Sequence, residues 1–299
     1  MTLAPHDKAR ISAVHGSLRA IRICILLAML ALACVWVRPL AAQDGPASAP
    51  SWADLADLAD ASQLVVRAEV KKQAELKPER AVGVAPGYTR LYIEAETIAL
   101  ISGSVPVGEK LRYLVDVPLD ERGRAPKLRK SEVLLFARAV PSRPGEIQLV
   151  ARDAQLPWSQ QLEDRLRPIL VALAAPDAAP AVGGVRDALS VEGNLSGESE
   201  TQIFLQTATG DPVSMSVVRR PGMRPVWGVS YSEIVDQAVQ APTPQTLGWY
   251  RLACFLPQTL PGGANLSTDP AGRAMAARDY AFVIEQLGPC QRTRTPPRG

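Results

Sequence analysis

The chain has 299 residues, a formal net charge of +3 at pH 7 and only two histidines, His6 and His15. Both histidines lie in a leader, residues 1–42, that has the features of a secretory signal peptide. We expect cleavage after Ala42, which leaves a mature chain without any imidazole. Catalytic triads and metal sites that use histidine are therefore excluded from the mature protein.

The leader has a basic amino-terminal region, then an uncharged apolar run, Ile23 to Val37, and then a short cleavage region that ends in small residues at Ala42. The run would reach about 22 Å as a helix, against ~30 Å for the core of a bilayer. An uncleaved anchor, or lipidation of Cys34, is the alternative interpretation. No later segment is apolar enough to span a membrane. We therefore predict an exported bacterial protein, periplasmic or secreted, with no membrane span after signal cleavage.

Cleavage also changes the charge. The leader contains five of the 33 Lys and Arg residues but one of the 30 Asp and Glu residues, which leaves 28 basic against 29 acidic residues. A nearly neutral mature chain gives no electrostatic reason to expect nucleic acid as a partner. The chain has no phosphate-binding glycine loop, calcium loop or paired CxxC motif, so no cofactor or metal is predicted.

Two cysteines, Cys254 and Cys290, remain after cleavage. Two cysteines in an exported chain most often pair, and without histidine they make a poor zinc site. A separation of 36 residues is too wide for a typical redox motif. We therefore predict a structural disulfide, with free thiols as the alternative.

A small-residue tether, residues 43–50, precedes the first predicted domain, residues 51–158. Ser51 begins a short helix, and strand-forming segments rich in β-branched and aromatic residues follow. The predicted strands are Gln63 to Val70, Arg90 to Ile101, Lys110 to Val117, Glu132 to Ala139 and Glu146 to Ala151. Five strands separated by turn signals indicate a small antiparallel β-barrel or sandwich.

Residues 60–155 resemble secreted OB-like or netrin-type β-barrels. The resemblance is carried by the run Leu64-Val65-Val66-Arg67-Ala68-Glu69-Val70, by a long strand that ends at Ile101-Ser102-Gly103, and by Leu134-Leu135-Phe136. It covers about a third of the chain and contains no catalytic residue. It implies a barrel fold and suggests an inhibitor of extracellular proteases as one possible function.

A helix and an Ala/Pro/Gly linker, residues 159–184, separate this domain from the second one, residues 185–292, and a disordered tail, residues 293–299, follows. Pro168 should kink or shorten the helix. Strands are predicted at Ala188 to Val191, Thr201 to Thr207, Val213 to Arg219 and Val226 to Val229. Three helices are predicted to begin at Ser230, at Thr243-Pro244 and at Asp269-Pro270. The fold class is therefore α+β: a β-rich domain, then an α+β domain with a hairpin or meander and three helices.

Two groups of residues are candidates for function. Glu198 and Glu200 precede or begin a strand and would share one face, where paired acids could cleave a glycan; a solvated turn is the alternative interpretation. Charged and aromatic side chains that could bind carboxylates gather around Pro221-Gly222; these are Arg219, Arg220, Arg224 and Trp227.

The favoured function is a non-enzymatic binding or scaffold module of the cell envelope. Its partner would be an envelope protein or an anionic polymer. The main alternative is a carboxylate-dependent, glycan-directed hydrolase that uses Glu198 and Glu200, and the third candidate is the protease inhibitor.

Overall fold

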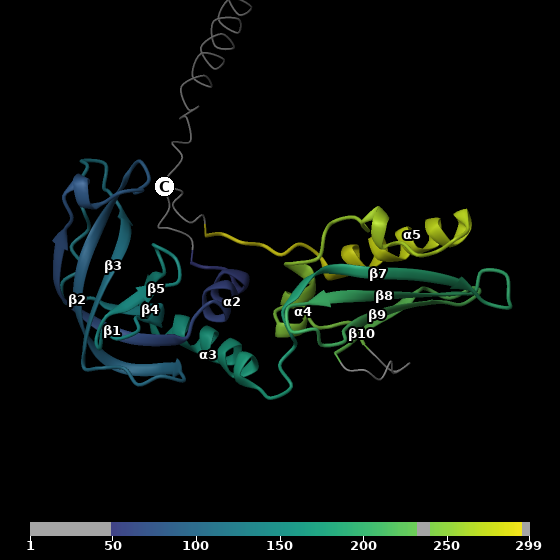
Figure 1. The fold of residues 1–299 in the computed structure, drawn as a ribbon, viewed down its shortest axis with the longest axis horizontal. Coiled ribbons are helices and arrows are strands. Elements are labelled where there is room, and N and C mark those ends of the chain that lie inside the picture. Colours follow the sequence, from purple (N-terminus) through teal and green to yellow (C-terminus); the bar gives the residue numbers. More distant parts are fainter. Residues whose placement is uncertain (1–48, 232–239, 295–299) are drawn as a thin grey trace, which may run out of the picture. The chain divides into compact units, whose positions relative to one another are not determined.

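The computed structural model describes residues 49–231 and 240–294 (Figure 1). These residues form ten strands in two antiparallel sheets, together with α-helices and short 3₁₀ turns. The predicted α+β class is therefore confirmed. None of the helices in the described ranges is long and apolar enough to cross a membrane.

The first sheet has six strands in the order β3-β2-β1-β4-β5, with β6 paired to β4. The strands are β1 Leu64–Glu75, β2 Tyr88–Gly103, β3 Lys110–Pro118, β4 Glu132–Ala139, β5 Ile147–Leu149 and β6 Gln155–Pro157. The five predicted strands are all present, and the bounds of β4 agree with the prediction. Strand β6 was not predicted because three residues are too few to show an alternating pattern.

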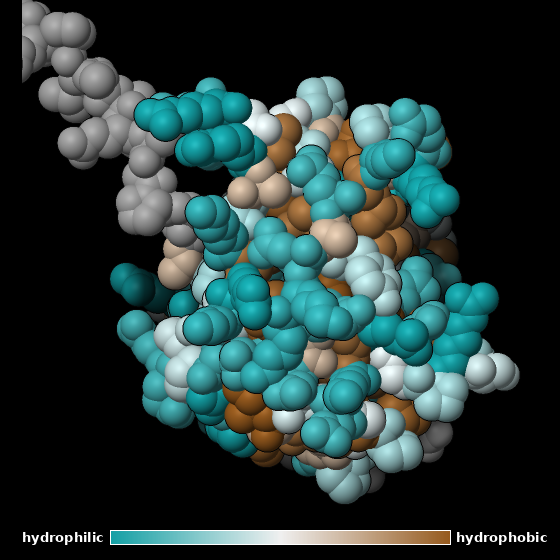
Figure 2. All heavy atoms as spheres, turned by 90° about the vertical axis from the view of Figure 1, so that its left-hand side faces the viewer, coloured by the Kyte–Doolittle hydropathy of each residue, from teal (hydrophilic) through white to brown (hydrophobic). Residues whose placement is uncertain are grey.

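Burial alternates along β2, as expected for a strand with one face in the core. Leu91, Ile93 and Ala95 are buried, whereas Tyr92 and Glu94 between them are partly exposed. The pairing of β1 with β2 shifts register at three places, and such irregularities bend and twist a sheet. Polar side chains cover most of the face at the left of Figure 1, with apolar patches between them (Figure 2).

This sheet is not a closed barrel, so the barrel form of the prediction is wrong. Strands β3 and β5 would have to pair along their length, but β3 has only one parallel bridge to this segment, between Arg112 and Glu146, the residue before β5. Strand β5 has only three residues, which is too short for a continuous ladder along the nine residues of β3.

Helices α2 (Trp52–Asp60) and α3 (Gln160–Ala174) are capped by Ser51 and Ser159. Ser51 was predicted as a cap, and a helix was predicted from Ser159. The Ser51 side chain accepts a hydrogen bond from the Asp54 amide, and the Asp54 carboxylate accepts one from the Ser51 amide. Pro168 lies inside α3, but the helix continues to Ala174, so the predicted shortening did not occur. Pro168 is on the exposed side of the helix, where water can replace the missing bond.

The second sheet is a four-stranded meander in the order β10-β9-β8-β7. Its strands are β7 Val182–Glu192, β8 Ser199–Thr207, β9 Ser214–Arg219 and β10 Val226–Ser230. Strand β7 begins within the segment that was predicted to be a linker. Val182 pairs there with Thr207 of β8, because a partner strand can order a sequence of low strand propensity.

Helix α5 (Pro270–Leu287) begins after its predicted cap Asp269, but α4 (Leu247–Ala253) begins later than predicted. Its cap is Thr246, not Thr243. Gln245 has a φ of 60°, a left-handed conformation that interrupts a right-handed helix. The helix predicted from Ser230 falls on residues 232–239, outside the described ranges. The 3₁₀ turns span Pro78–Arg80 and Gly262–Ala264.

The carboxylates of α2 bind the later part of the chain. Asp57 accepts a hydrogen bond from the Tyr250 hydroxyl at 2.7 Å, and Asp60 pairs with both terminal nitrogens of Arg251. Asp54 accepts hydrogen bonds from the amide and hydroxyl of Thr293, in the segment predicted to be a disordered tail. Helix α2 is thus held to α4 and to the chain beyond α5 by charge-assisted hydrogen bonds.

Glu163 links the start of α3 to the first sheet. Its carboxylate accepts a hydrogen bond from the Trp158 indole at 2.7 Å and pairs with Arg167, and the residue is 4% exposed. These partners, Trp158 first, lower the pKa of Glu163 although burial opposes them. The guanidinium of Arg67 lies 3.5 Å from the Trp158 ring centre and completes the cluster.

We expect Glu163→Gln to lower the free energy of unfolding by about 1 to 2 kcal/mol near neutral pH, because charge-assisted hydrogen bonds are lost. The lowered pKa means that the wild-type charge stabilises the fold above the unfolded pKa, and that this contribution disappears as pH falls through the folded pKa. Urea unfolding of both proteins at several pH values measures the difference. A difference that grows on acidification would contradict this assignment.

Candidate functional site

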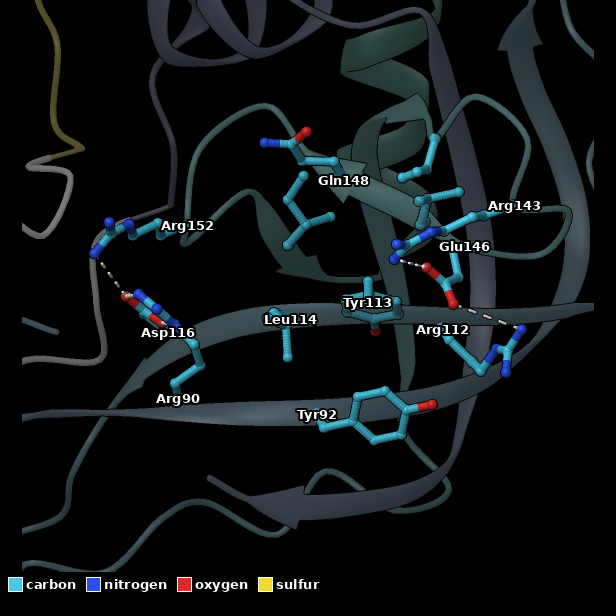
Figure 3. A pocket seen from close by; sticks show the side chains of 13 residues that line it. Arg90, Tyr92, Arg112, Tyr113, Leu114, Asp116, Arg143, Glu146, Gln148 and Arg152 are labelled. Atoms are coloured by element: carbon cyan, nitrogen blue, oxygen red, sulfur yellow. Dashed lines mark hydrogen bonds and ion pairs between the residues drawn. The ribbon is translucent and has the colours of Figure 1, made fainter. Parts of the chain in front are cut away.

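A cavity of about 480 Å³ lies between β3 and the segment that contains β5 (Figure 3). We call it the β3–β5 cavity. Its size is within the range of ligand sites. Its charged lining consists of four arginines and two acids: Arg90, Arg112, Arg143, Arg152, Asp116 and Glu146.

The outer edge of β3 is hydrogen-bonded at the two ends of this cavity. The Arg112 amide donates to the Gly145 carbonyl at 2.8 Å, and the Asp116 amide donates to the Arg152 carbonyl at 2.7 Å. The Leu114 amide between them points the same way, because direction alternates along a strand. In the described part of the chain, no backbone hydrogen bond joins Leu114 to β5, so the edge is open there.

At one end of the cavity, Asp116 is buried and held by Arg90. The guanidinium of Arg90 donates to both carboxylate oxygens, at 2.6 and 2.8 Å, and the Asp116 side chain is 1% exposed. The Asp116 hydrogen bonds raise the pKa of Arg90. Arg152 donates to the Gly83 carbonyl and lies 3.9 Å from Asp116, with about half of its side chain exposed. The Asp116 carboxylate is thus neutralised by Arg90, and the positive charge of Arg152 has no negative charge of its own at this end of the cavity.

At the other end, two arginines share Glu146. Arg143 lies 3.3 Å and Arg112 3.8 Å from the Glu146 carboxylate, and Figure 3 shows both side chains converging on it. Both distances are long for a charge-assisted hydrogen bond. The Arg143 side chain is 69% exposed. This end also has one positive charge more than it has negative charges.

Between its two charged ends, the cavity is lined by uncharged side chains, some polar and some apolar. Tyr92, Leu114 and Gln148 lie there, and Leu114 is 46% exposed although it is a large apolar side chain in a strand. Tyr92 and Leu114 are directly paired across β2 and β3. An exposed leucine beside an aromatic ring offers apolar contact to a ligand.

A second cavity of about 510 Å³ shares Arg112 with the first. Lys71, Lys72 and Lys110 line it together with Glu94 and Glu96. Lys72 pairs with Glu94 at 2.9 Å, which raises the pKa of Lys72. We call the two cavities together the basic groove; its basic residues are Arg90, Arg112, Arg143, Arg152, Lys71, Lys72 and Lys110. Its acids are the four already named, so the groove has a positive excess.

This groove was not predicted from the sequence. Its residues come from β1, β2, β3 and the segment after β4. Strand pairing places Lys72, Glu94 and Arg112 side by side, and the curvature of the sheet adds the segment after β4. One signal was available: Arg112, Leu114 and Asp116 alternate along a predicted strand with Tyr113 and Val115, which identifies one face as charged.

Glu198 and Glu200 are each paired locally. The Glu198 carboxylate accepts a hydrogen bond from the Leu195 amide at 3.3 Å, within the turn that leads into β8. Glu200 lies in β8, is exposed and accepts from the Gln202 side chain at 2.6 Å. A partner within three residues is typical of turn and strand-surface acids. A catalytic role for the two acids stays a prediction.

The arginines near Pro221 differ in their surroundings. Arg219 donates to Asp279 of α5 at 2.5 Å, and Asp279 is fully buried and also accepts from Thr201 of β8. Arg220 and Arg224 are exposed in the turn between β9 and β10, and Trp227 is partly buried in β10. Arg219 therefore attaches α5 to the sheet, while a binding role for this group stays a prediction.

Cys254, the first residue after α4, forms a disulfide with Cys290, three residues beyond the end of α5. Their Cα atoms are 5.0 Å apart. Within residues 49–231 and 240–294, no group of three or more His, Cys, Asp or Glu side chains is placed to hold a metal ion. Comparison with protein-family models and with curated proteins found no match.

We expect Arg219→Ala to lower the free energy of unfolding by about 3 kcal/mol or more, because Asp279 would remain buried without its partner. Arg220→Ala and Arg224→Ala should change it by no more than about 0.5 kcal/mol, since both side chains are exposed. Urea unfolding of the three variants makes the comparison. Similar losses in all three would contradict the separate role of Arg219.

Proposed function

We propose that this chain is an exported, non-enzymatic binding module of the cell envelope that holds an anionic ligand in its basic groove. The observation that carries the proposal is the excess of arginine at both ends of the β3–β5 cavity. Several ion pairs elsewhere in this chain are close and one to one, as between Arg251 and Asp60 at 2.6 Å. In the cavity, two arginines share each carboxylate, and three of the four lie 3.3 to 3.9 Å from it.

An excess of exposed guanidinium groups is well suited to bind carboxylate, sulfate or phosphate oxygens, because each guanidinium offers two parallel donors. The near-neutral mature chain makes this excess local. A locally positive groove attracts an anionic ligand without attracting anions over the whole surface.

Two other expectations remain part of the proposal. A periplasmic or secreted location is supported by the Cys254 and Cys290 pair, since disulfides persist in oxidising compartments. The likeness to OB-like modules stays part of the proposal; a strand order with β1 between β2 and β4, and the parallel bridge from β3 to Glu146 just before β5, are compatible with it.

The test measures binding of the chain to polyglutamate and to dextran sulfate by isothermal titration calorimetry, with polylysine as the control of opposite charge. We expect both polyanions to bind, with an affinity that falls steeply as salt is raised, and polylysine not to bind. The variants Arg143→Gln and Arg152→Gln should each weaken binding about tenfold, because each removes a charge-assisted contact.

Arg124→Gln is the matched control, because it removes an exposed arginine that pairs with Asp120 and does not line the groove. It should bind like the wild type. If Arg124→Gln weakens binding as much as the groove variants, attraction is a property of overall charge and the proposed site is wrong. Absence of binding to both polyanions would overturn the proposed function.

A further inference from the structure

We propose that the ligand of the basic groove is an extended acidic peptide that pairs with the open edge of β3 at Leu114. The inference rests on the proposed function and narrows it to one class of ligand. It combines two observations at one place: free backbone groups on a strand edge, and an excess of positive charge on either side of them.

The open edge is the feature that distinguishes a peptide from other polyanions. The Arg112 and Asp116 amides are bonded to Gly145 and Arg152, but the edge at Leu114 between them is not paired with β5. Only the central part of an extended peptide can pair there, because Gly145 and Arg152 occupy the edge on either side of Leu114. That part supplies a carbonyl and an amide to the free edge, as in β-strand addition. A sulfated or uronic polysaccharide without amides has no equivalent backbone.

The charges fix the spacing of the acids. Arg112 and Asp116 are four residues apart in β3, which corresponds to about 13 Å. Arg112 and Arg143 lie at one end, and Arg152, beside Asp116, lies at the other (Figure 3). Side chains four residues apart in an extended peptide lie on the same face at the same spacing. The ligand should therefore carry acids at positions i and i+4.

The middle of the cavity favours an uncharged central residue. Leu114 and Tyr92 are directly opposite each other in β3 and β2, and Gln148 faces the same space. A residue of moderate size between the two acids would contact Leu114 and Tyr92 without burying a third charge. The site thus favours a five-residue peptide with acidic residues at its first and fifth positions and three uncharged residues between them.

The probe is a fluorescein-labelled peptide, Asp-Val-Thr-Val-Asp with glycine on either side, and fluorescence anisotropy measures its binding to the whole chain. We expect Arg143→Gln and Arg152→Gln each to weaken binding about tenfold and Arg124→Gln to leave it unchanged. A second peptide with the same composition but the two acids only two residues apart should bind about tenfold more weakly.

Two N-methylated peptides test the backbone pairing. One carries the methyl group on the amide of the central threonine, and the other carries it on both neighbouring valines, so that one of them blocks pairing whichever way the peptide runs. We expect one of the two to bind about fivefold more weakly than the parent, the effect of a lost backbone hydrogen bond. Binding of both at parental affinity would overturn the pairing with β3.

The outcomes separate this inference from the proposed function. If dextran sulfate binding depends on Arg143 and Arg152 but the peptide does not bind, the groove binds anions and the peptide inference is wrong. If neither ligand depends on these arginines, the proposed function is wrong as well. Circular dichroism and thermal unfolding of each variant verify that the fold is retained.

Discussion

The basic groove depends on the ion pair between Arg90 and Asp116. The Asp116 carboxylate is almost excluded from water, where an unpaired charge would cost several kcal/mol. Arg90 lies directly opposite in β2 and donates to both carboxylate oxygens. Because the Asp116 amide also binds the Arg152 carbonyl, the pair fixes the point where the chain after β5 meets β3. This one buried pair therefore fixes one end of the cavity and the position of Arg152 there.

Local sequence patterns predicted helices and strands well wherever the deciding interactions are between residues close in the sequence. Ser51, Ser159 and Asp269 cap the helices that follow them, and the alternation of Leu91, Ile93 and Ala95 identifies the buried face of β2. Prediction failed where a distant segment decides the structure. Val182 is in a strand because Thr207 pairs with it, and β3 fails to close on β5 because too few residues of β5 extend to meet it.

The two arginine sites illustrate the same limit for function. Arg219, Arg220 and Arg224 are close in sequence and were therefore noticed, but Arg219 is bound to Asp279, which is 60 residues away. Thr201 completes that cluster: its single proton goes to Asp279, so the Ser190 hydroxyl must donate to Thr201. The arginines of the groove are dispersed over 62 residues, from Arg90 to Arg152, and the pairing of β2 with β3 and the curvature of the sheet bring them to one cavity.

The difference between these arginines is a physical criterion for function. A charge that the fold requires is buried and closely paired, because leaving it unpaired would cost more than the pairing gains. Arg219 and Arg294 come close to this description: their side chains are only 22% and 16% exposed, Arg219 pairs with the buried Asp279, and Arg294 lies 2.8 Å from Asp153. Arg143 and Arg152 do not: their side chains are 69% and 49% exposed, and each of their acids has a second arginine. The positive charges of these two side chains are therefore not required to stabilise the fold. The backbone groups of Leu114 on the β3 edge likewise have no partner within the described part of the fold. The exposed arginines and this free edge lie in the same cavity, which is the reason to assign them to one ligand.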